Sequence, residues 1–262
     1  MKIEICGKGG SGKSTLAALL SKSFTREGFR VLLVDADESN MGLPHTLAEN
    51  PAPLHLMDFL GGKKGFKEKL NQKMMMDNPA GIFSGKQTID DLPADCMGSE
   101  DGLSFLVIGK IHHFGEGCAC PMGVLSKKFL ASLETRIGEV VVVDTEAGVE
   151  HFGRGMAGEA DIVLGVIDPT AESFRMAEKI SEMAKNANAA AYFVLNKVEP
   201  AIEAAMLSHL DGERVVGRIP KNNEIFLSSL EGRSLSARLP EVDAVCKEII
   251  SRHSLMVSAK PS

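Results

Sequence analysis

Residues 7–15 read Gly7-Lys8-Gly9-Gly10-Ser11-Gly12-Lys13-Ser14-Thr15, and they lie between a short apolar run at 2–6 and a helical pattern at 14–26. Glycines allow backbone N–H groups to turn toward a phosphate, and the N-terminus of the following helix adds the positive end of its dipole. A strand, this loop and a helix in that order form the context that a Walker A motif, or P-loop, requires. Because all nine residues match in that context, a chance glycine-rich turn is a poor explanation. The stretch predicts a site for nucleotide phosphates.

Two side chains in this loop have expected roles in binding a nucleotide with its metal ion. Lys13 is expected to bridge the β- and γ-phosphates, and Ser14 to supply a hydroxyl ligand to Mg²⁺. Together with Thr15 and the glycines, they form the phosphate half of the predicted site.

Short apolar, β-branched runs recur along the chain and alternate with helical patterns. We expect strands at residues 2–6, 30–34, 103–108, 140–143, 162–167, 191–195 and 215–219. Residues 140–143 are four consecutive valines, as in a central strand that is covered on both faces. Helical patterns are visible at 14–26 and 171–185. The alternation predicts an α/β fold with a mostly parallel sheet and helices on both faces.

The segment 44–100 interrupts this alternation. It contains Pro51, Pro53, several glycines and a basic patch at 63–69. We interpret it as an irregular insertion with one or two helices, so that residues 1–262 form a single domain.

Composition limits the class of partner. The net charge is −6, Trp is absent and Tyr occurs once among 262 residues. An acidic chain with no Trp and one Tyr does not favour nucleic acid. No apolar run reaches the roughly 18–20 residues that span a bilayer. The N-terminus goes straight into residues 2–5 and shows no apolar region of a signal peptide. The apolar stripe after Pro240 lacks a basic face and predicts docking on the core. We expect a cytoplasmic protein that binds neither nucleic acid nor membrane.

A second lysine makes the phosphate loop unusual. Lys8 stands five positions before Lys13, which gives the pattern K-G-G-x-G-K-S. This pattern resembles the deviant Walker A family of P-loop ATPases, which includes MinD, ParA and the nitrogenase iron protein. The resemblance implies an ATP-dependent homodimer in which Lys8 reaches the ATP of the partner subunit. A cation there would neutralise charge that develops on the transferred phosphoryl group.

Two acidic residues at predicted strand ends continue the resemblance. Asp37 follows the strand at 30–34 and matches the family aspartate of the first switch, which orients the attacking water and lies near Mg²⁺. Asp144 ends the valine strand, as a Walker B carboxylate does, and is expected to hold Mg²⁺ through a water. Residues 144–148 resemble the second switch, whose backbone senses the γ-phosphate. An isolated acid could equally cap a helix, but strand ends beside a P-loop favour a site.

Base recognition is expected near the last two strands. Asn196 and Lys197 resemble the family's adenine-contacting segment, and Pro220 with Lys221 resembles the second loop that flanks the base. The chain has no Asn-Lys-x-Asp motif, whose carboxylate would select guanine. We therefore expect ATP rather than GTP.

The chain has five cysteines, an odd number, and we expect it in a reducing compartment, so a disulfide framework is not expected. One pair of cysteines has the spacing of metal ligands. Cys118 and Cys120 are separated by one residue and follow a glycine-rich lead-in. One pair supplies two donors, whereas a stable soft-metal site usually has four. A two-fold dimer would bring four thiolates together, for Zn²⁺ if tetrahedral or Ni²⁺ if square planar. The alternative is an incidental pair of loop cysteines. His112 and His113 are nearby, but adjacent side chains diverge, so a solvated loop is the better interpretation for them.

The combination of a deviant P-loop, the C-x-C pair and residues 144–155 resembles a narrower family. It is similar to the CooC-type nickel-insertion ATPases of carbon monoxide dehydrogenase and acetyl-CoA synthase maturation. The resemblance covers nearly the whole chain, and 44–100 is its weakest part. It implies a homodimer that binds ATP and nickel and delivers the metal to a client such as carbon monoxide dehydrogenase.

Two alternatives come from the wider family. An ATP-driven iron–sulfur reductase like the nitrogenase iron protein would place a cysteine near Cys118, but its second cysteine should follow Asp144, and residues 145–160 contain none. A MinD- or ParA-like positioning ATPase would need a membrane or DNA surface, and neither role explains the C-x-C pair.

Overall fold

A computed structural model describes residues 1–39, 43, 47, 54–75, 83, 85–110, 120–148 and 157–258. Its described strands form one eight-stranded sheet in the order β3-β4-β2-β5-β1-β6-β7-β8. Every neighbouring pair is parallel except β3 with β4. The strands are β1 (Lys2–Gly7), β2 (Arg30–Asp35), β3 (Met97–Glu100), β4 (Leu103–Val107), β5 (Glu139–Asp144), β6 (Ile162–Ile167), β7 (Ala190–Val198) and β8 (Val215–Pro220).

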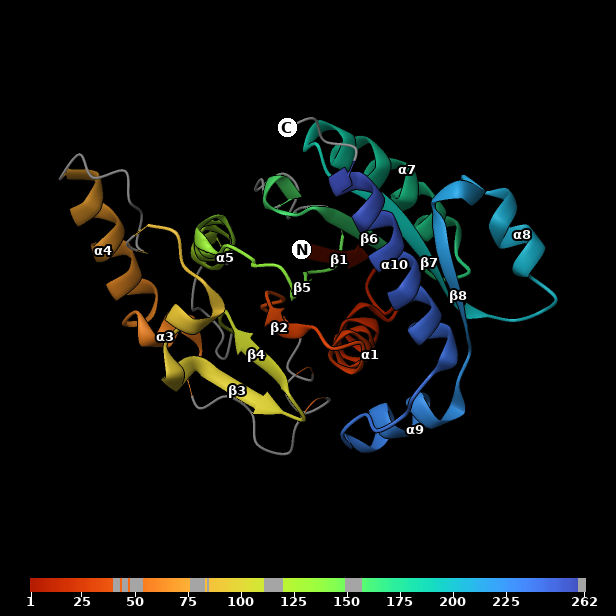
Figure 1. Ribbon diagram of the computed structural model, residues 1–262, viewed down its shortest axis with the longest axis horizontal. Helices are drawn as coiled ribbons and strands as arrows, with labels where there is room; N and C mark the ends of the chain where they lie inside the picture. Colours follow the sequence, from red (N-terminus) through yellow and green to blue (C-terminus); the bar gives the residue numbers. More distant parts are fainter. Residues whose placement is uncertain are drawn as a thin grey trace.

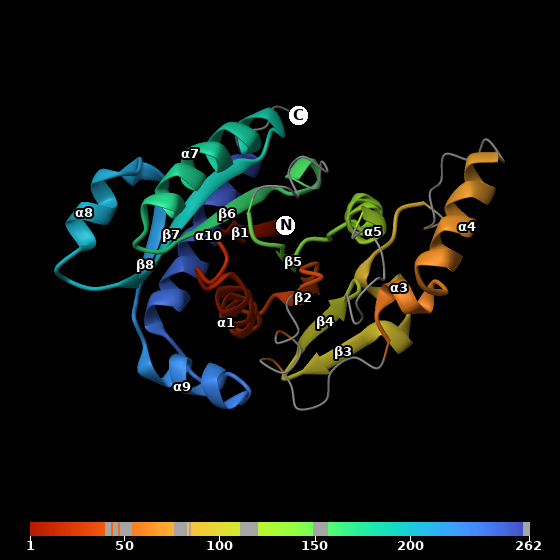
Figure 2. The same cartoon turned by 180° about the vertical axis from the view of Figure 1, so that it is seen from behind.

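Helices cover both faces of this sheet (Figures 1 and 2). The longer ones are α1 (Lys13–Arg26), α4 (Gly62–Met75), α5 (Cys120–Ser132), α7 (Ala171–Asn186), α9 (Asn223–Glu231) and α10 (Pro240–Ser258). Shorter turns are α3 (Leu56–Phe59), α8 (Glu203–Ser208), η1 (Ile89–Asp91), η2 (Ala94–Cys96), η3 (Ala157–Glu159) and η4 (Gly212–Arg214). The predicted α/β class with a mostly parallel sheet is confirmed, and all seven predicted strands are present.

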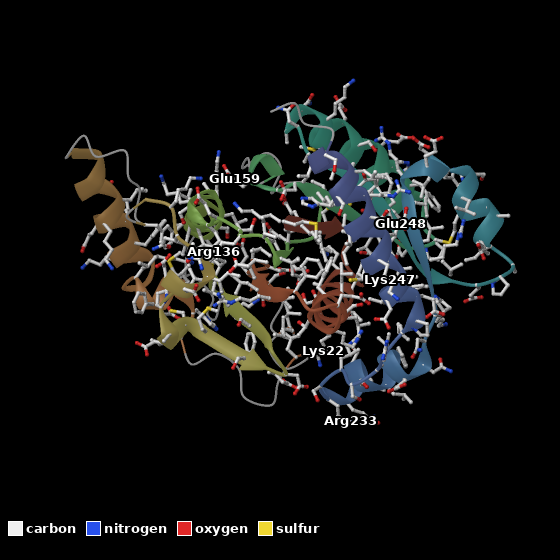
Figure 3. All side chains as sticks on the ribbon, in the orientation of Figure 1. Lys22, Arg136, Glu159, Arg233, Lys247 and Glu248 are labelled. Carbon is white, nitrogen blue, oxygen red and sulfur yellow. The ribbon has the colours of Figure 1, made fainter. Side chains whose placement is uncertain are left out.

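One face of the sheet packs against α1 and α10, which lie side by side in Figure 1. The apolar stripe on α10 is buried, as predicted: Val245, Cys246 and Ile249 have no exposed surface. Lys22 of α1, labelled in Figure 3, donates from Nζ to the Leu235 carbonyl oxygen at 2.8 Å. This contact joins α1 to the segment that follows α9.

The opposite face is covered in two parts. Residues of α3, α4 and α5 pack on β2, β4 and β5, while α7 and α8 pack on β6 and β7. The described part of the 44–100 segment therefore contributes Leu56, Phe66 and Cys96 to the buried core on this face. One or two helices were predicted in this segment, and its described part contains α3 and α4; its strand β3 was not predicted. None of the described helices is long and apolar enough to cross a bilayer.

The strand order indicates where a ligand is expected to bind, which is at the carboxyl ends of the parallel strands. In parallel sheets the carboxyl ends of the strands meet at one edge, and ligands bind where the connections diverge. Here β2, β5, β1 and β6 are consecutive, so Asp35 and Asp144 come opposite one another in register, beside the loop after Gly7. The residues that follow β6 lie at the same edge.

Candidate nucleotide-binding site

The P-loop turns sharply from β1 into α1. The Ser11 N–H donates to the Lys8 carbonyl oxygen at 3.1 Å, and Gly12 precedes α1 with a φ of 101°. A side chain at position 12 would be strained at this φ, and its Cβ would lie 2.3 Å from Nδ2 of Asn196. The N-cap residue of α1 is Gly12, which has no side chain to cap the first turn. The N–H groups of that turn are thus available to a phosphate.

Lys13 is the first residue of α1 and is buried, with 6% of its surface exposed. Its Nζ lies 3.4 Å from the carbonyl oxygen of Lys8, which keeps the ammonium group over the loop. The loop therefore presents backbone donors and one fixed cation to the same space.

A cavity of about 810 Å³, here called the P-loop cavity, opens beside this loop. Its size is within the roughly 300–1,000 Å³ usual for ligand pockets. Nearly all the residues predicted to bind nucleotide line it: Gly9, Gly10, Gly12, Lys13, Ser14, Thr15, Asp37, Asn196, Lys197, Pro220 and Lys221. Apolar side chains line it as well: Leu16, Leu19, Leu43, Ile219, Ile225 and Phe226. A lining that combines polar and apolar side chains suits a nucleotide, which has charged phosphates and an aromatic base.

Asn196 and Lys197 have contacts that sequence reasoning did not foresee. The Asn196 amide donates to the Ser11 carbonyl oxygen at 2.7 Å, and the Lys197 ammonium donates to the Gly10 carbonyl oxygen at 2.6 Å. Lys197 also has a positive φ of 57°. These two residues of β7 hold the P-loop backbone at the edge of the cavity where the base was expected.

Asp144 lies at the end of β5 and has no exposed surface. Both of its carboxylate oxygens are buried and lack a hydrogen-bond partner among the described residues. Burial, reinforced by the neighbouring Asp35 carboxylate, raises the pKa of Asp144 to about 8, although the Ser14 hydroxyl and Lys13 act in the opposite direction. A fully buried carboxylate beside a serine hydroxyl fits an Mg²⁺ ion that would neutralise it. Ser14 and Asp144 would hold that ion.

Residues 35–39, which include the predicted first switch, begin at the last residue of β2 and have a dense set of contacts. The Asp37 carboxylate accepts from the backbone N–H and the hydroxyl of Ser39, at 3.0 and 2.7 Å. The Asp37 N–H donates to the Asp35 carboxylate at 3.1 Å. Lys110, just after β4, forms a 2.7 Å ion pair with Asp35 and also donates to the Asp37 carbonyl oxygen. Burial raises the pKa of Asp35 to about 6, although Lys110 opposes that change.

The segment predicted to be the second switch begins at the end of β5. The Thr145 hydroxyl donates to the Ile5 carbonyl oxygen at 2.7 Å, and the Gly148 N–H donates to the Gly7 carbonyl oxygen at 3.1 Å. These bonds place residues 145–148 alongside the P-loop, where Ala147 lines the P-loop cavity. A γ-phosphate would therefore meet the backbone of this segment.

Lys8 points away from the cavity in the single chain. Its Nζ lies 3.3 Å from Oδ2 of Asp168, the residue that follows β6. Asp168 also accepts hydrogen bonds from the hydroxyls of Thr170 and Ser173. Burial alone would raise the pKa of Asp168, but these hydroxyls and the Lys8 ammonium lower it below its usual range. Lys8 is thus placed at the edge of the site, beside a smaller hollow lined by Gly148, Arg175 and Lys179.

The predicted cysteine site is only partly within the described residues. Cys118, His112 and His113 lie outside them, and Cys120 is the first residue of α5 rather than part of a loop. Among the described residues, no three His, Cys, Asp or Glu side chains are grouped to hold a metal. Cys6, Cys96 and Cys246 are buried free thiols.

Lys110 and Asp168 were missed by sequence reasoning. Asp168 could have been found, because it follows an apolar strand in the same way as Asp37 and Asp144. Lys110 belongs to no motif, and only the pairing of β4 with β2 reveals its partner.

The fold and this arrangement of loop, lysine and strand-end carboxylates define a P-loop nucleotide-binding ATPase. Residues 5–235 match the family model described as the CobQ/CobB/MinD/ParA nucleotide binding domain. The chain belongs to that family.

Similar proteins agree with this assignment. An uncharacterized ATP-binding protein of Methanocaldococcus jannaschii is 45% identical, over 96% of this chain and 100% of its own length. The carbon monoxide dehydrogenase accessory protein CooC of Rhodospirillum rubrum is 29% identical, over 98% of this chain and 95% of its own length. The structure of MinD from Pyrococcus horikoshii, complexed with Mg-ADP, has a TM-score of 0.69 at 18% identity and covers 97% of both chains. That likeness concerns the fold.

Proposed function

We propose that this protein is an ATP-dependent, homodimeric maturation ATPase that binds nickel or zinc through Cys118 and Cys120 of both subunits. In this proposal it assists nickel insertion into an enzyme of the carbon monoxide dehydrogenase type. The main support is a combination in one chain: a complete P-loop site with the extra Lys8, a C-x-C pair, and 29% identity over 98% of the chain to a carbon monoxide dehydrogenase accessory protein.

ATP with Mg²⁺ is the nucleotide of this proposal. Lys13 and the P-loop backbone bind the phosphates, while Ser14 and Asp144 hold Mg²⁺. Asp37 orients the attacking water, and its position on the wall of the P-loop cavity with Lys13 and Ser14 is compatible with that role. Asn196, Lys197, Pro220 and Lys221 border the base. Mg²⁺, when bound, would neutralise charge on the β- and γ-phosphates.

The dimer explains two otherwise incomplete features. Lys8 pairs with Asp168 at the rim of the site and does not reach the P-loop cavity of its own chain. In a closed dimer it would act on the partner's ATP. Two cysteines from each chain would likewise complete a four-thiolate site. ATP would stabilise the closed dimer, and hydrolysis would remove the γ-phosphate that held it.

Two further parts of the proposal concern the chain as a whole. We propose one domain for residues 1–262, because the described part of 44–100 supplies β3 and core residues to the same sheet and face. We also propose a cytoplasmic location, where thiols stay reduced and free to bind metal.

A metal titration with and without a non-hydrolysable ATP analogue tests the metal site. We expect about one Ni²⁺ or Zn²⁺ per dimer, as four donors require. The double variant Cys118→Ala/Cys120→Ala should lose this binding and keep its ATP affinity. The matched control is Cys246→Ala, which removes a buried thiol on α10. Normal metal binding by the double variant would refute the site.

The dimer and the catalytic roles are tested separately. Lys8→Ala should lose ATP-driven dimerisation in light scattering, whereas Asp37→Asn should dimerise but turn over slowly. If Lys8→Ala hydrolyses ATP at the wild-type rate as a monomer, Lys8 does not act in trans.

A positioning ATPase of the MinD or ParA type is the second candidate, because the MinD fold covers nearly the whole chain. ATP-dependent sedimentation with anionic liposomes, or an ATP-dependent DNA shift, would favour it over the metal-delivery role.

A further inference from the structure

We propose that Lys110 is a positioning residue for ATP hydrolysis, which sets the place of Asp37 without touching the nucleotide. The proposal rests on the role proposed above for Asp37. It assigns a specific task to a buried lysine that no P-loop motif includes.

The first step concerns the contacts of Lys110. Only 3% of its side chain is exposed, and its ammonium group lies 2.7 Å from Oδ2 of Asp35. The same group donates to the backbone carbonyl oxygen of Asp37. An ammonium group has three donors and no acceptor. Lys110 therefore joins the side chain of one switch residue to the backbone of another.

The second step concerns the backbone of Asp37, which is held on both sides. Its N–H donates to Oδ1 of Asp35, and its carbonyl oxygen accepts from Lys110. Asp35 is itself anchored in the sheet, because its carbonyl oxygen accepts from the Ile108 N–H at 2.9 Å. Asp35, Lys110 and Asp37 thus form a closed ring of contacts. This ring fixes the Asp37 backbone, and with it the position from which the Asp37 carboxylate extends.

The third step separates positioning from binding. Asp37 lines the P-loop cavity, whereas Lys110 is absent from its described lining. Removing Lys110 should leave the phosphate contacts in place and displace the Asp37 carboxylate. Small displacements of catalytic groups reduce rates by up to about 100-fold. The loss is therefore expected in kcat rather than in nucleotide affinity.

Burial also argues against a purely stabilising role. A buried ion pair costs desolvation energy, and apolar residues of similar volume are often as stable or more so. A lysine at this buried position is better explained by the geometry that it imposes.

The experiment compares Lys110→Met with the double variant Asp35→Leu/Lys110→Met. Lys110→Met should lower kcat for MgATP by about 10- to 100-fold and change the Kd for MgADP by less than about threefold. Lys110→Arg keeps the charge and the donors, so it should recover part of kcat. Lys247→Met removes an exposed lysine of α10 and serves as the matched control.

The double variant separates positioning from stability, and it carries the test if Lys110→Met does not fold. It replaces the buried pair by apolar groups, so stability should return while kcat stays low. Recovery of kcat with stability, or loss of MgADP binding, would overturn the proposal. Asp37→Asn separates the role proposed for Asp37 from the role proposed for Lys110. Turnover at the wild-type rate in Asp37→Asn refutes the role of Asp37 itself. Slow turnover of Asp37→Asn with a normal Lys110→Met refutes only the role of Lys110.

Discussion

Two lysine–aspartate pairs stand on opposite sides of the P-loop, and they differ mainly in burial. Lys110 and Asp35 are 2.7 Å apart with 3% of each side chain exposed, between β4 and β2. Lys8 and Asp168 are 3.3 Å apart with 22% and 8% exposed, between the P-loop and the end of β6. A buried pair is costly to break, whereas an ion pair near water is worth little. The first pair suits a fixed framework, and the second suits a cation that has to change partners.

The largest expected effect is on stability. Lys110→Met leaves the Asp35 carboxylate buried without its cation, and the free energy of unfolding should fall by roughly 3–5 kcal/mol. Lys8→Met leaves Asp168 with two hydroxyl donors and some water, so its cost should be about 0–1 kcal/mol. Urea denaturation of both variants measures the difference. Equal losses would show that burial does not distinguish the pairs.

A smaller effect is expected on dimerisation. In the proposed dimer Lys8 must leave Asp168 before it reaches the partner's ATP. Asp168→Asn keeps the side-chain size but removes the charge. Each dimer breaks two such partly exposed pairs, each worth at most about 1 kcal/mol, so ATP-driven association should tighten by up to about 30-fold. Analytical ultracentrifugation with an ATP analogue measures this constant. Weaker association would mean that Asp168 assists the dimer.

The smallest effect concerns salt. Screening lengths fall from roughly 10 Å at 0.1 M to 3 Å at 1 M salt, and buried pairs are screened much less. The association advantage of Asp168→Asn should therefore shrink toward one as salt rises. The stability loss in Lys110→Met should hardly change over the same range. A salt-independent ratio for Asp168→Asn would contradict the exposed-pair interpretation.

Sequence patterns predicted the framework of the fold because burial on both faces leaves a clear signal. Strands such as 140–143 are continuous apolar runs, and the P-loop has a strict spacing. Strand β3 was missed because Met97–Glu100 is short, lies at the edge and contains Gly98. That glycine lies opposite Phe105, and its Cβ would come within 2.2 Å of the ring. Its presence is explained by the neighbouring strand rather than by the local sequence.

The site was predictable to the extent that its residues sit at strand ends. Asp37 and Asp144 were found in this way, and they lie at the same edge of the sheet. Lys110 was not predicted, since its contact with Asp35 depends on β4 being the strand beside β2. The partner of Lys8 was missed for the same reason, because Asp168 follows β6 and reaches the P-loop only through the pairing of β6 with β1.

Gly12 and Asn196 join the P-loop to the part of β7 that is proposed to border the base. The Asn196 amide occupies the space that a Cβ at position 12 would need, and it holds the Ser11 carbonyl oxygen. The Lys197 ammonium donates to the carbonyl oxygen of Gly10, the preceding residue of the loop. Position 12 is therefore restricted twice, because a side chain there would be strained at a φ of 101° and would also meet the Asn196 amide. Since Asn196 is also a proposed neighbour of the base, a substitution at position 196 would disturb the P-loop backbone together with that proposed contact.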